Sequence, residues 1–406
     1  MSGSPSQSPI YLDYLATTPI CEEASQAMIH LLNKQTQPEG CWGNAGSEHH
    51  VYGRLAKQKL ESAREKVARM LNASSPKEIY FESGSTETIN HAIKGVLQKA
   101  SPNRTHVVLS SIEHPAVAET VSQATAAVKG SYTVVEPNSQ GVVEASAVAQ
   151  ACRKGETAIV TVMLVNNELG SVMNWPAISK AVKAVDPNII LHCDASQGVG
   201  KIPVDVRAMG VDLLTVAGHK FYAPKGIGAL YIRDGVEVSS LIHGAGHESG
   251  RRAGTENMLL AVALGEACEA AANKCLKSLD RTRSLREKLF RLISDALAEG
   301  SVIRNGPEDD SQRLPGALSI SFTGGLYGSE IARLAGEAGV AFSAGAACHS
   351  GQKAKPSKVL KAVGMDDVSA LGTIRLSIGR YTTEAVSLCH LTIRTAILTS
   401  RYSLGN

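Results

Sequence analysis

Strand-like and helix-like segments alternate between roughly residues 79 and 235, and this alternation constrains the fold more than any other feature of the sequence. Apolar runs with the length of strands are EIYF, THVVLSS, YTVVEP, AIVTVMLV, NIILHCD, DLLTVAG and GALYI. Between them, segments such as ETINHAIKGVLQKA and AISKAVKAV carry apolar residues at helical spacing. This pattern predicts an α/β fold with a mainly parallel sheet that is covered by helices on both faces.

A second, smaller unit follows the predicted sheet. An Ala- and Leu-rich helical stretch begins at Met258 and leads into an α+β segment that ends near Tyr402. Because 406 residues exceed what one small core requires, we expect a large domain and a smaller one. The expected units are a flexible leader (1–10), an N-terminal segment that packs with the small domain (11–25), a large domain (26–275) and a small C-terminal domain (276–406).

Composition narrows the class of protein. The formal net charge of +3 gives no reason to expect nucleic acid or an anionic membrane as the main partner. No apolar run approaches the ~20 residues that span a bilayer. The first residues show neither an apolar signal core nor an arginine-rich pattern, so we expect a cytoplasmic protein. The eight cysteines are dispersed without a C-x-x-C pair, which favours free thiols, and we expect no metal site.

Polar side chains follow the predicted strands at the points where they end. Asn167, Asp194, Gln197, His219 and Lys220 all occupy such positions, and ligands of parallel sheets bind beyond the carboxyl ends of the strands. A lysine flanked by a histidine and a glycine-rich turn is suited to form a Schiff base. An acid at a neighbouring strand end is suited to pair with a pyridinium nitrogen, as pyridoxal-phosphate chemistry requires. The alternative for an isolated GHK tripeptide is a surface lysine after a buried strand.

Two glycine-containing segments are candidates to bind a phosphate. FESGSTETINHAIKG places Ser85 and Thr86 at a strand-to-helix junction, where the helix N-terminus favours negative charge. The alternative is an ordinary helix start. HGAGHESGRRAGTENM contains Thr255, a possible hydroxyl donor to a phosphate, and the absence of interleaved aromatics argues against nucleic-acid contact.

Four further side chains have a functional and a structural interpretation. His114 follows a predicted strand and either stacks on a cofactor ring or serves as a packed or capping residue. Arg375 and Arg380 are both candidates to bind a carboxylate through a bidentate fork, and the alternative is an arginine in solvent at a strand edge. Cys348 lies in a polar loop with His349 beside it, which favours a nucleophilic thiolate over a buried small residue.

Together these segments, from YLDYLATTP (residues 11–19) to IRLSIGRYTT (374–383), resemble the class V aminotransferase family, and within it the cysteine desulfurase and selenocysteine lyase branch. The resemblance implies the fold type I of pyridoxal 5'-phosphate enzymes, as in aspartate aminotransferase. It also implies that Lys220 binds the cofactor covalently, that Asp194 pairs with the pyridine nitrogen and that Gln197 bonds the ring hydroxyl. His114 would stack on the ring and relay protons.

The same resemblance implies how the cofactor phosphate is bound. Ser85, Thr86 and His219 would hold it within one subunit. Thr255 would reach it from the other subunit of a homodimer. One phosphate donor of the desulfurases is missing, because Ala217 stands where they usually have a serine.

For the substrate, the resemblance implies that Arg375 and Asn167 bind the carboxylate, with Asn167 also contacting the cofactor. Cys348 would attack the sulfur or selenium atom. An acceptor protein would then take up the sulfur or selenium.

Three departures from desulfurases bear on the substrate: Ala217, Tyr14-Leu15 in place of the commoner Asn-Ala, and the loop GAACHSG around Cys348. Ala217 and His349 resemble selenocysteine lyases, whereas GRRAGTEN resembles bacterial desulfurases. The leading expectation is therefore a lyase that removes selenium or sulfur from selenocysteine or cysteine to give alanine. The alternatives are a cysteine desulfurase that supplies persulfide sulfur, a class V aminotransferase and a non-enzymatic carrier or scaffold.

Overall fold

The computed structural model describes residues 9–347 and 355–404, so the candidate nucleophile Cys348 lies outside the described residues. Its largest sheet has seven strands in the order β2-β8-β7-β6-β5-β3-β4. The strands are β2 (Ile79–Glu82), β3 (His106–Ser110), β4 (Ser131–Val135), β5 (Thr157–Met163), β6 (Ile190–Asp194), β7 (Leu213–Ala217) and β8 (Gly228–Ile232). Five neighbouring strands, from β4 to β7, run parallel, and β8 is antiparallel to both β7 and β2. The prediction of a mainly parallel sheet is confirmed.

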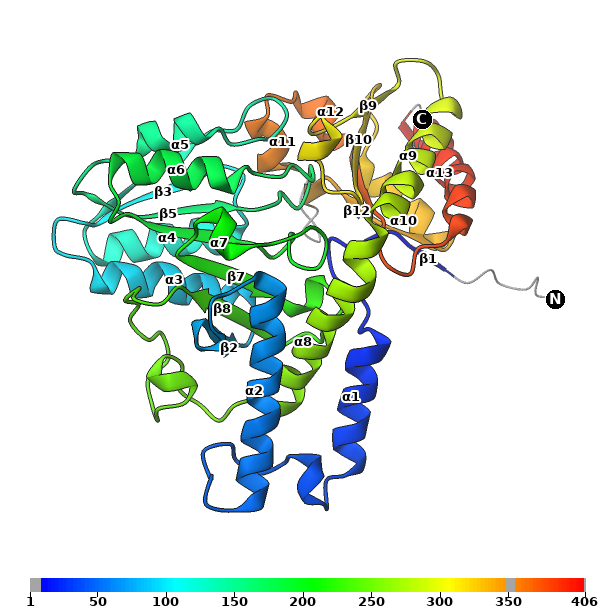
Figure 1. The fold of residues 1–406 in the computed structure, drawn as a ribbon. Coiled ribbons are helices and arrows are strands. Elements are labelled where there is room, and N and C mark those ends of the chain that lie inside the picture. The colour runs from blue at the N-terminus through cyan, green and yellow to red at the C-terminus, as the bar shows by residue number, and fades with distance from the viewer. Residues whose placement is uncertain (1–8, 348–354, 405–406) are drawn as a thin grey trace.

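Helices cover both faces of this sheet (Figure 1). The elements on its two faces are α3 (Ser85–Lys99) and α4 (Pro115–Ala127) on one face, and α5 (Ala145–Ala151) and α6 (Trp175–Val185) on the other. Alternate side chains of a strand point to opposite faces. In β3, Val107 and Leu109 accordingly join the core beneath α3 and α4, whereas Val108 joins the core beneath α6. Burial on both faces explains why the central strands of this sheet, such as β5, are mostly apolar.

A second sheet, with four antiparallel strands in the order β12-β15-β10-β9, lies in the C-terminal part of the chain. Its strands are β9 (Val302–Arg304), β10 (Ala317–Phe322), β12 (Ser343–Ala344) and β15 (Thr373–Ser377). The helices that share its core are α9 (Leu279–Asp295), α10 (Gly328–Glu337) and α13 (Cys389–Leu404). Shorter elements of this part are β11 (Val340–Ala341), β13 (Ala346–Ala347), β14 (Lys355–Pro356), α11 (Lys358–Ala362) and α12 (Asp367–Leu371).

The N-terminal segment joins this second unit. Strand β1 (Ile10–Tyr11) pairs in parallel with β11, and Asp13 bridges to Ser377 of β15. Ile10 thus belongs to a strand, although the sequence placed it in the leader. From there the chain crosses to the large sheet, where the backbone N–H of Thr18 donates to the carbonyl oxygen of His219.

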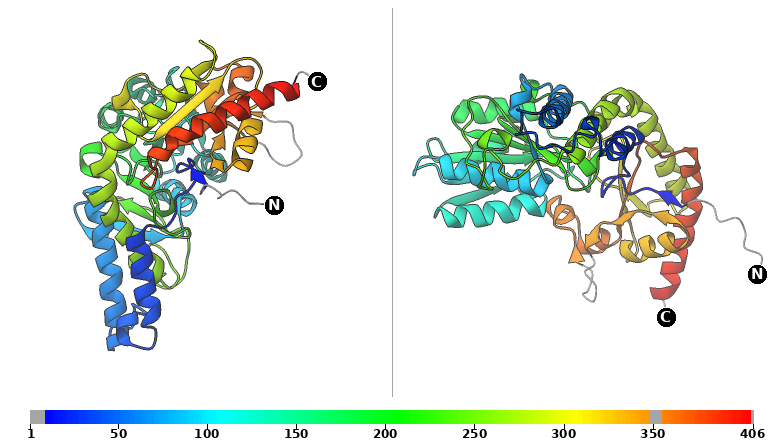
Figure 2. Two further views of the ribbon diagram at one scale, coloured as in Figure 1. Left: turned by 90° about the vertical axis from the view of Figure 1, so that its right-hand side faces the viewer. Right: turned by 90° about the horizontal axis from the view of Figure 1, so that it is seen from below.

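Two long helices and α8 extend away from the sheets (Figure 2). They are α1 (Glu22–Asn33), α2 (Val51–Leu71) and α8 (Met258–Ala270), and α8 packs against the other two. The helical stretch expected to run on from Met258 is interrupted: a π-helical turn (Ala271–Cys275) and a 3₁₀ turn (Leu276–Ser278) separate α8 from α9. The domain boundary expected at residue 275 falls at this interruption.

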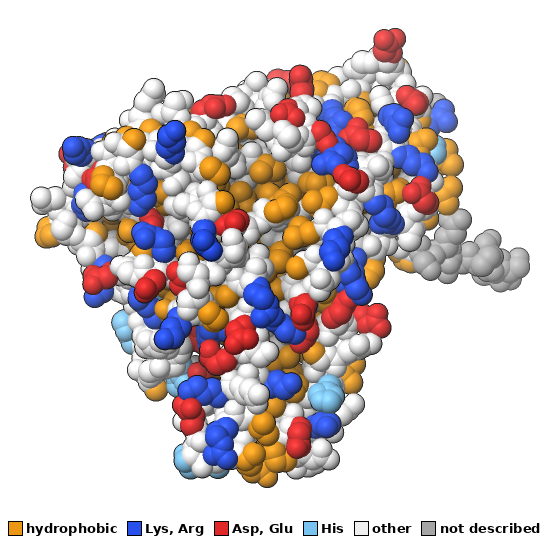
Figure 3. Space-filling view, viewed as in Figure 1, with side chains coloured by type: hydrophobic (Ala, Val, Ile, Leu, Met, Phe, Trp, Pro, Cys, Tyr) orange, Lys and Arg blue, Asp and Glu red, His pale blue; other side chains and the backbone are white. Residues whose placement is uncertain are grey.

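The described residues can also be assessed for surface charge, membrane-spanning helices, metal sites and disulfides. On the face shown in Figure 3, basic and acidic side chains are interspersed around an apolar band. Among the described residues, no helix combines the length and the apolarity that a membrane crossing requires. The same residues contain no group of three or more His, Cys, Asp or Glu side chains that is placed to hold a metal. All seven described cysteines are free.

Candidate active site

A pocket lies at the carboxyl ends of β5, β6 and β7, where the N-terminal segment and β15 close it from the other side. Its lining residues are Leu15, Ala16, Ser85, His114, Met163, Val165, Asn167, Asp194, Ser196, Gln197, Lys220 and Arg375. Seven of them were candidates from the sequence alone. The tertiary structure therefore brings together most of the residues that were singled out along more than 290 positions of the chain.

Lys220 ends the short 3₁₀ turn (Gly218–Lys220) that follows β7. Its ammonium donates hydrogen bonds to the carbonyl oxygens of Leu15 (3.1 Å) and Ala16 (2.8 Å). Burial, together with the positive charge of Arg375, lowers the pKa of Lys220 to about 8. About a tenth of this amine is therefore neutral at pH 7, which a nucleophilic or proton-accepting lysine requires.

Asp194 is the last residue of β6, the strand beside β7. Its Oδ1 accepts hydrogen bonds from the backbone N–H (3.0 Å) and the hydroxyl (2.5 Å) of Ser196. The side chain is buried, with 5% exposure, so its carboxylate faces the pocket with little competition from water. Such an acid is suited to pair with a protonated ring nitrogen.

Gln197 is oriented by two partners. Its Nε2 donates to the carbonyl oxygen of Leu15 (2.9 Å), and its Oε1 accepts from Nζ of Lys201 (2.6 Å). A carbonyl oxygen accepts only, so the contact with Leu15 fixes which end of the amide is the donor. Leu15 thus contacts both Gln197 and Lys220 through one backbone oxygen.

His114 is the N-cap residue of α4, and its Nδ1 accepts a hydrogen bond from the backbone N–H of Ala116 (3.1 Å). Burial lowers the pKa of His114, so the ring is neutral at pH 7. With Nδ1 occupied as an acceptor, the neutral ring carries its proton on Nε2 and acts as a hydrogen-bond donor. The capping and the functional interpretation of His114 are therefore compatible, because the residue caps α4 and lines the pocket.

The start of α3 forms the end of the pocket that is suited to an anion. Ser85 lines the pocket, and Thr86 follows it on the exposed side of the first turn. The N-cap residue Gly84 has no side chain, so no side-chain cap occupies the first N–H groups of α3 in the described chain. A Cβ on Gly228 of β8 would lie only 2.9 Å from Cα of Gly84, which explains the glycine at this close approach.

His219 precedes Lys220 but is absent from the pocket lining given above. Its Nδ1 lies 3.0 Å from Oγ1 of Thr17, and burial lowers its pKa to about 4, so it is neutral at pH 7. Ala217, two residues earlier, is a buried residue of β7 and supplies no hydroxyl. A phosphate bound beside β7 would therefore receive no side-chain hydrogen bond from position 217.

Arg375 of β15 forms the opposite wall. Its guanidinium donates to the carbonyl oxygen of Asn167 (2.9 Å), to Oδ1 of Asp13 (3.0 Å) and to Oγ of Ser343 (3.0 Å). Its Nε is buried and has no partner among the described residues. An arginine with an unused donor beside a lysine is suited to bind a substrate carboxylate.

The other candidate arginine, Arg380, forms a bidentate ion pair with Glu23 (2.8 and 3.0 Å). It is absent from the lining of this pocket, so the structure distinguishes two arginines that the sequence left equivalent.

Thr255, like Thr86, His219 and Arg380, is absent from the lining of this pocket. It occupies an exposed loop between β8 and α8, beyond the ion pair of Arg252 with Glu87 (2.8 Å). The expectation that it serves a neighbouring subunit agrees with this position and stays a prediction.

The donor set fits pyridoxal phosphate. Asp194 supplies an anion for the pyridine nitrogen, Lys220 supplies an amine with a lowered pKa, and the uncapped start of α3 supplies N–H groups for the phosphate. These groups belong to one pocket, as a single bound molecule requires.

Several contributors were missed in the sequence. The backbone oxygens of Leu15 and Ala16 carry no signal, because any residue has a carbonyl group. Asp13 and Lys201 act through contacts with Arg375 and Gln197, and only the spacing of four residues between Gln197 and Lys201 hinted at the latter.

Comparisons with known proteins agree with this geometry. The profile of the family "Aminotransferase class-V" matches residues 10–386. Two relatives named "Cysteine desulfurase IscS" are 39% identical (Dictyoglomus turgidum; 92% of this chain and 91% of that protein) and 40% identical (Aeromonas hydrophila; 93% and 89%). A solved "NifS-like protein" superimposes with a TM-score of 0.86 at 32% identity, covering 96% of this chain and 99% of that chain.

A second solved structure, "SspA in complex with cysteine", superimposes with a TM-score of 0.75 at 33% identity, over 92% of this chain and 100% of that one. These likenesses confirm the expected fold type I, which the seven-stranded sheet already indicated. The chain therefore belongs to the class V aminotransferase family and is a pyridoxal-phosphate-dependent enzyme.

Proposed function

We propose that the protein is a cysteine desulfurase, which removes the sulfur atom of L-cysteine and leaves L-alanine. The observation that carries this proposal is one pocket that joins a lysine and an acid suited to the cofactor with an arginine suited to an amino-acid carboxylate. The relatives named as cysteine desulfurases, at about 39% identity over nine-tenths of the chain, favour cysteine over the leading expectation of selenocysteine.

In this proposal each wall of the pocket has its own task. Arg375 and Asn167 bind the substrate carboxylate, and Lys220 moves the proton at Cα once its amine is free. Pyridoxal phosphate, when bound, supplies a sink for the electron pair that this proton leaves behind. Neutral His114, whose Nδ1 accepts from Ala116, would stack on the aromatic ring and relay protons through Nε2.

Cys348 is the proposed nucleophile, and it lies outside the described residues. Its thiolate attacks the sulfur of the substrate, an S–S bond forms and the Cβ–S bond breaks. Cβ receives a proton, so that cysteine and the enzyme thiol become alanine and an enzyme persulfide without any external oxidant or reductant. A thiolate of an acceptor protein then takes the outer sulfur and restores the Cys348 thiol.

Selenocysteine stays the second candidate substrate, because Ala217 and His349 depart from desulfurases in the direction of selenocysteine lyases. A selenol is more acidic than a thiol and leaves more readily, so the same pocket would release selenium with less help from Cys348. An aminotransferase has no use for that cysteine, and a scaffold has no use for Lys220.

The test is alanine formation from cysteine and from selenocysteine, measured side by side for the native protein and for Cys348→Ala. We expect turnover of cysteine, its loss in Cys348→Ala, and a smaller loss with selenocysteine, while the cofactor stays bound in both proteins. A Cys348→Ala protein that desulfurates cysteine at the native rate would remove this cysteine from the mechanism. Turnover of selenocysteine alone would restore the lyase as the function.

We further propose a cytoplasmic homodimer in which Thr255 of each subunit reaches the phosphate site of the other. The exposed position of Thr255, away from the pocket of its own chain, supports this arrangement. A two-fold dimer is the commonest assembly for such a protein. Light scattering that shows a fully active monomer would contradict it.

The division into a large domain (26–275) and a small domain (276–406) is likewise a proposal. It is supported by the two separate sheets and by the interruption between α8 and α9. Limited proteolysis should cut first near residues 271–278 if the boundary lies there.

A further inference from the structure

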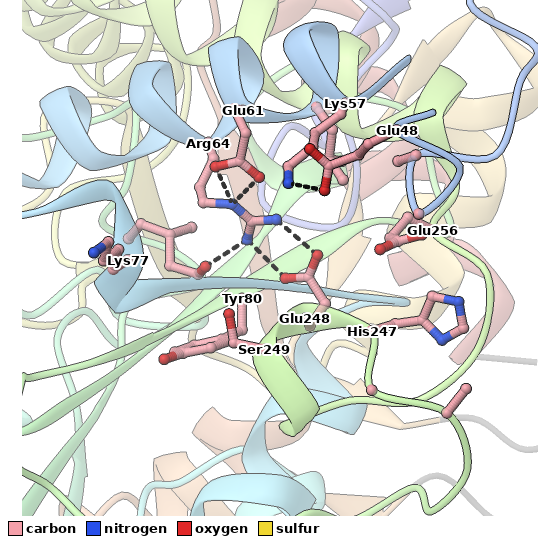
Figure 4. Close-up of a pocket in the computed structure, with 16 residues that line it drawn as sticks. Glu48, Lys57, Glu61, Arg64, Lys77, Tyr80, His247, Glu248, Ser249 and Glu256 are labelled. Atoms are coloured by element: carbon pink, nitrogen blue, oxygen red, sulfur yellow. Dashed lines mark hydrogen bonds and ion pairs between the residues drawn. The ribbon is translucent and has the colours of Figure 1, made fainter. Parts of the chain in front are cut away.

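The loop that carries Thr255 runs from residue 239 to residue 257, between β8 and α8, and we call it the 239–257 loop. Several of its residues line a second pocket with α2 and β2 (Figure 4). Most of the loop is exposed, but Glu248 is buried, with 6% exposure. A buried carboxylate in an exposed loop requires a partner.

That partner is Arg64 of α2, which is itself 7% exposed. The two guanidinium NH groups of Arg64 donate to the two carboxylate oxygens of Glu248, at 2.7 and 2.8 Å, as Figure 4 shows. Arg64 also donates to the carbonyl oxygen of Ile79, and Glu248 accepts from the backbone N–H of Phe81 (2.8 Å). The pair therefore connects α2, the strand β2 and the 239–257 loop at one point.

The backbone at this point is strained. Glu248 has φ +48° and the next residue, Ser249, has φ +54°, in the left-handed region that favours glycine. Non-glycine residues persist there only when surrounding contacts hold them. The bidentate pair and the bond from Phe81 are such contacts, and they reach the side chain of one of the two strained residues.

A second ion pair ties the loop to α3. Arg252 donates from Nε to Oε1 of Glu87 (2.8 Å), and Oε2 of Glu87 accepts from the backbone N–H of Ser83 (2.8 Å). Glu87 lies in the first turn of α3, whose start is the anion-binding end of the active site. Thr255 follows Arg252 by three residues and is exposed.

We propose that the Arg64–Glu248 ion pair is a positioning device: it holds the 239–257 loop in the strained conformation that presents Thr255 to the phosphate site of the second subunit. The proposal rests on the homodimer of the proposed function. The apparent affinity of a site falls in proportion to the fraction of molecules that hold the binding-competent conformation. If loss of the ion pair lowers the fraction of molecules with the 239–257 loop in place, the phosphate site of the other subunit binds the cofactor more weakly. Arg64 and Glu248 are absent from the lining of the active-site pocket given above.

The decisive experiment uses mixed dimers in which one subunit carries Lys220→Ala, so that only the other subunit binds the cofactor covalently. Glu248→Gln is placed either on the subunit with Lys220→Ala or on the subunit with intact Lys220. Glutamine keeps the size of the side chain but turns an amide N–H group or an uncharged oxygen toward Arg64. The readout is the amount of cofactor fixed to Lys220 by borohydride, measured by peptide mass spectrometry over a range of pyridoxal phosphate concentrations.

We expect half-saturation at about tenfold more cofactor when Glu248→Gln lies on the Lys220→Ala subunit, and no change in the opposite arrangement. A role confined to the folding of its own subunit would give the reverse pattern or equal losses, and either result overturns the proposal. No shift in both arrangements overturns it as well. A chain that stays monomeric refutes the homodimer, and this proposal falls with it.

Glu61→Gln is the matched control. Glu61 accepts from Nε of the same arginine at 3.2 Å but lies on α2 and is about half exposed, so its loss leaves the loop in place. If Glu248→Gln does not fold, Arg252→Gln, which breaks the second ion pair, takes its place in the mixed dimers. We again expect weaker cofactor binding only when this substitution lies on the Lys220→Ala subunit. Hydrogen exchange of residues 243–256 should be faster in Glu248→Gln and unchanged in Glu61→Gln.

Discussion

The two walls of the active site are built in different ways. Asp194 ends β6 and Lys220 follows β7, and these two strands are hydrogen-bonded neighbours in the large, mainly parallel sheet. Arg375 lies on the antiparallel sheet of the C-terminal unit, where Ser343 is its neighbour in register. The first wall is set by strand register within one sheet, whereas the second is set by how two units pack. Asp194 and Lys220, which we propose to contact the cofactor, thus lie on the first wall, and Arg375, which we propose to bind the substrate carboxylate together with Asn167, lies on the second.

The N-terminal segment joins the two walls. The carbonyl oxygens of Leu15 and Ala16 accept from Lys220, and the carboxylate of Asp13 accepts from Arg375. Residues 13–16 of this segment therefore contact both walls: Asp13 contacts Arg375, and Leu15 and Ala16 contact Lys220. A movement of this segment would therefore change the contacts of both Lys220 and Arg375.

The largest expected effect concerns the wall of the large sheet. Lys220→Ala should reduce turnover by at least ~10³-fold, because both the covalent link and the proton carrier are lost. Borohydride reduction and peptide mapping should place the cofactor on Lys220 in the native protein. The control is Lys225→Ala, five residues away and exposed, which should retain activity. A label on Lys201 or Lys225 would refute the assignment.

The opposite wall should give a different kinetic signature. Arg375→Gln should raise KM for the amino-acid substrate roughly 10- to 100-fold, the value of a charge-assisted hydrogen bond, with a smaller effect on kcat. Arg380→Gln is the matched control, since that arginine pairs with Glu23 and lies outside the pocket lining. Equal KM values for the two variants would show that Arg375 does not bind the carboxylate.

The two walls are also coupled electrostatically. Burial and the charge of Arg375 lower the pKa of Lys220 to about 8, so in the cofactor-free protein its amine should become reactive near pH 8. Arg375→Gln removes a positive charge, stabilises the ammonium form and should move this midpoint upward. Competitive acetylation followed by mass spectrometry measures both midpoints, with Lys225 as an internal reference for the reagent. A downward shift in the variant would contradict the coupling.

The smallest effect is expected at Asp13, which competes with the substrate carboxylate for Arg375. Asp13→Asn should lower KM by about two- to fivefold, the scale of a partly exposed ion pair. Steady-state kinetics at constant salt measure the change. A rise in KM would instead show that Asp13 orients the guanidinium for the substrate.

The residues of the wall on the large sheet could be predicted from the sequence. The strands that end at Asp194 and Ala217 are mostly apolar, so their ends and the polar residues beyond them were visible as a pattern. The wall on the small sheet was harder to predict. Arg375 and Arg380 were equivalent candidates in the sequence, and only the structure shows that Arg380 pairs with Glu23 whereas Arg375 lines the pocket. The strand pairing of Ile10 was missed, because it depends on contact with β11, which is distant in the sequence. Residue 275, where the domain boundary was expected, lies in the turns that separate α8 from α9.

The sequence by itself determined the layered sheet, the family and most of the pocket residues, because strand periodicity and strand-end polarity are local properties of the chain. Only the tertiary structure decided that backbone oxygens of Leu15 and Ala16 face Lys220, and that Glu248 is buried against Arg64. Those contacts join residues that are 184 or more positions apart. Every residue has a carbonyl group, and a sequence does not show which acid pairs with which base. The partners of Lys220 and of Glu248 are therefore fixed only when the whole chain packs.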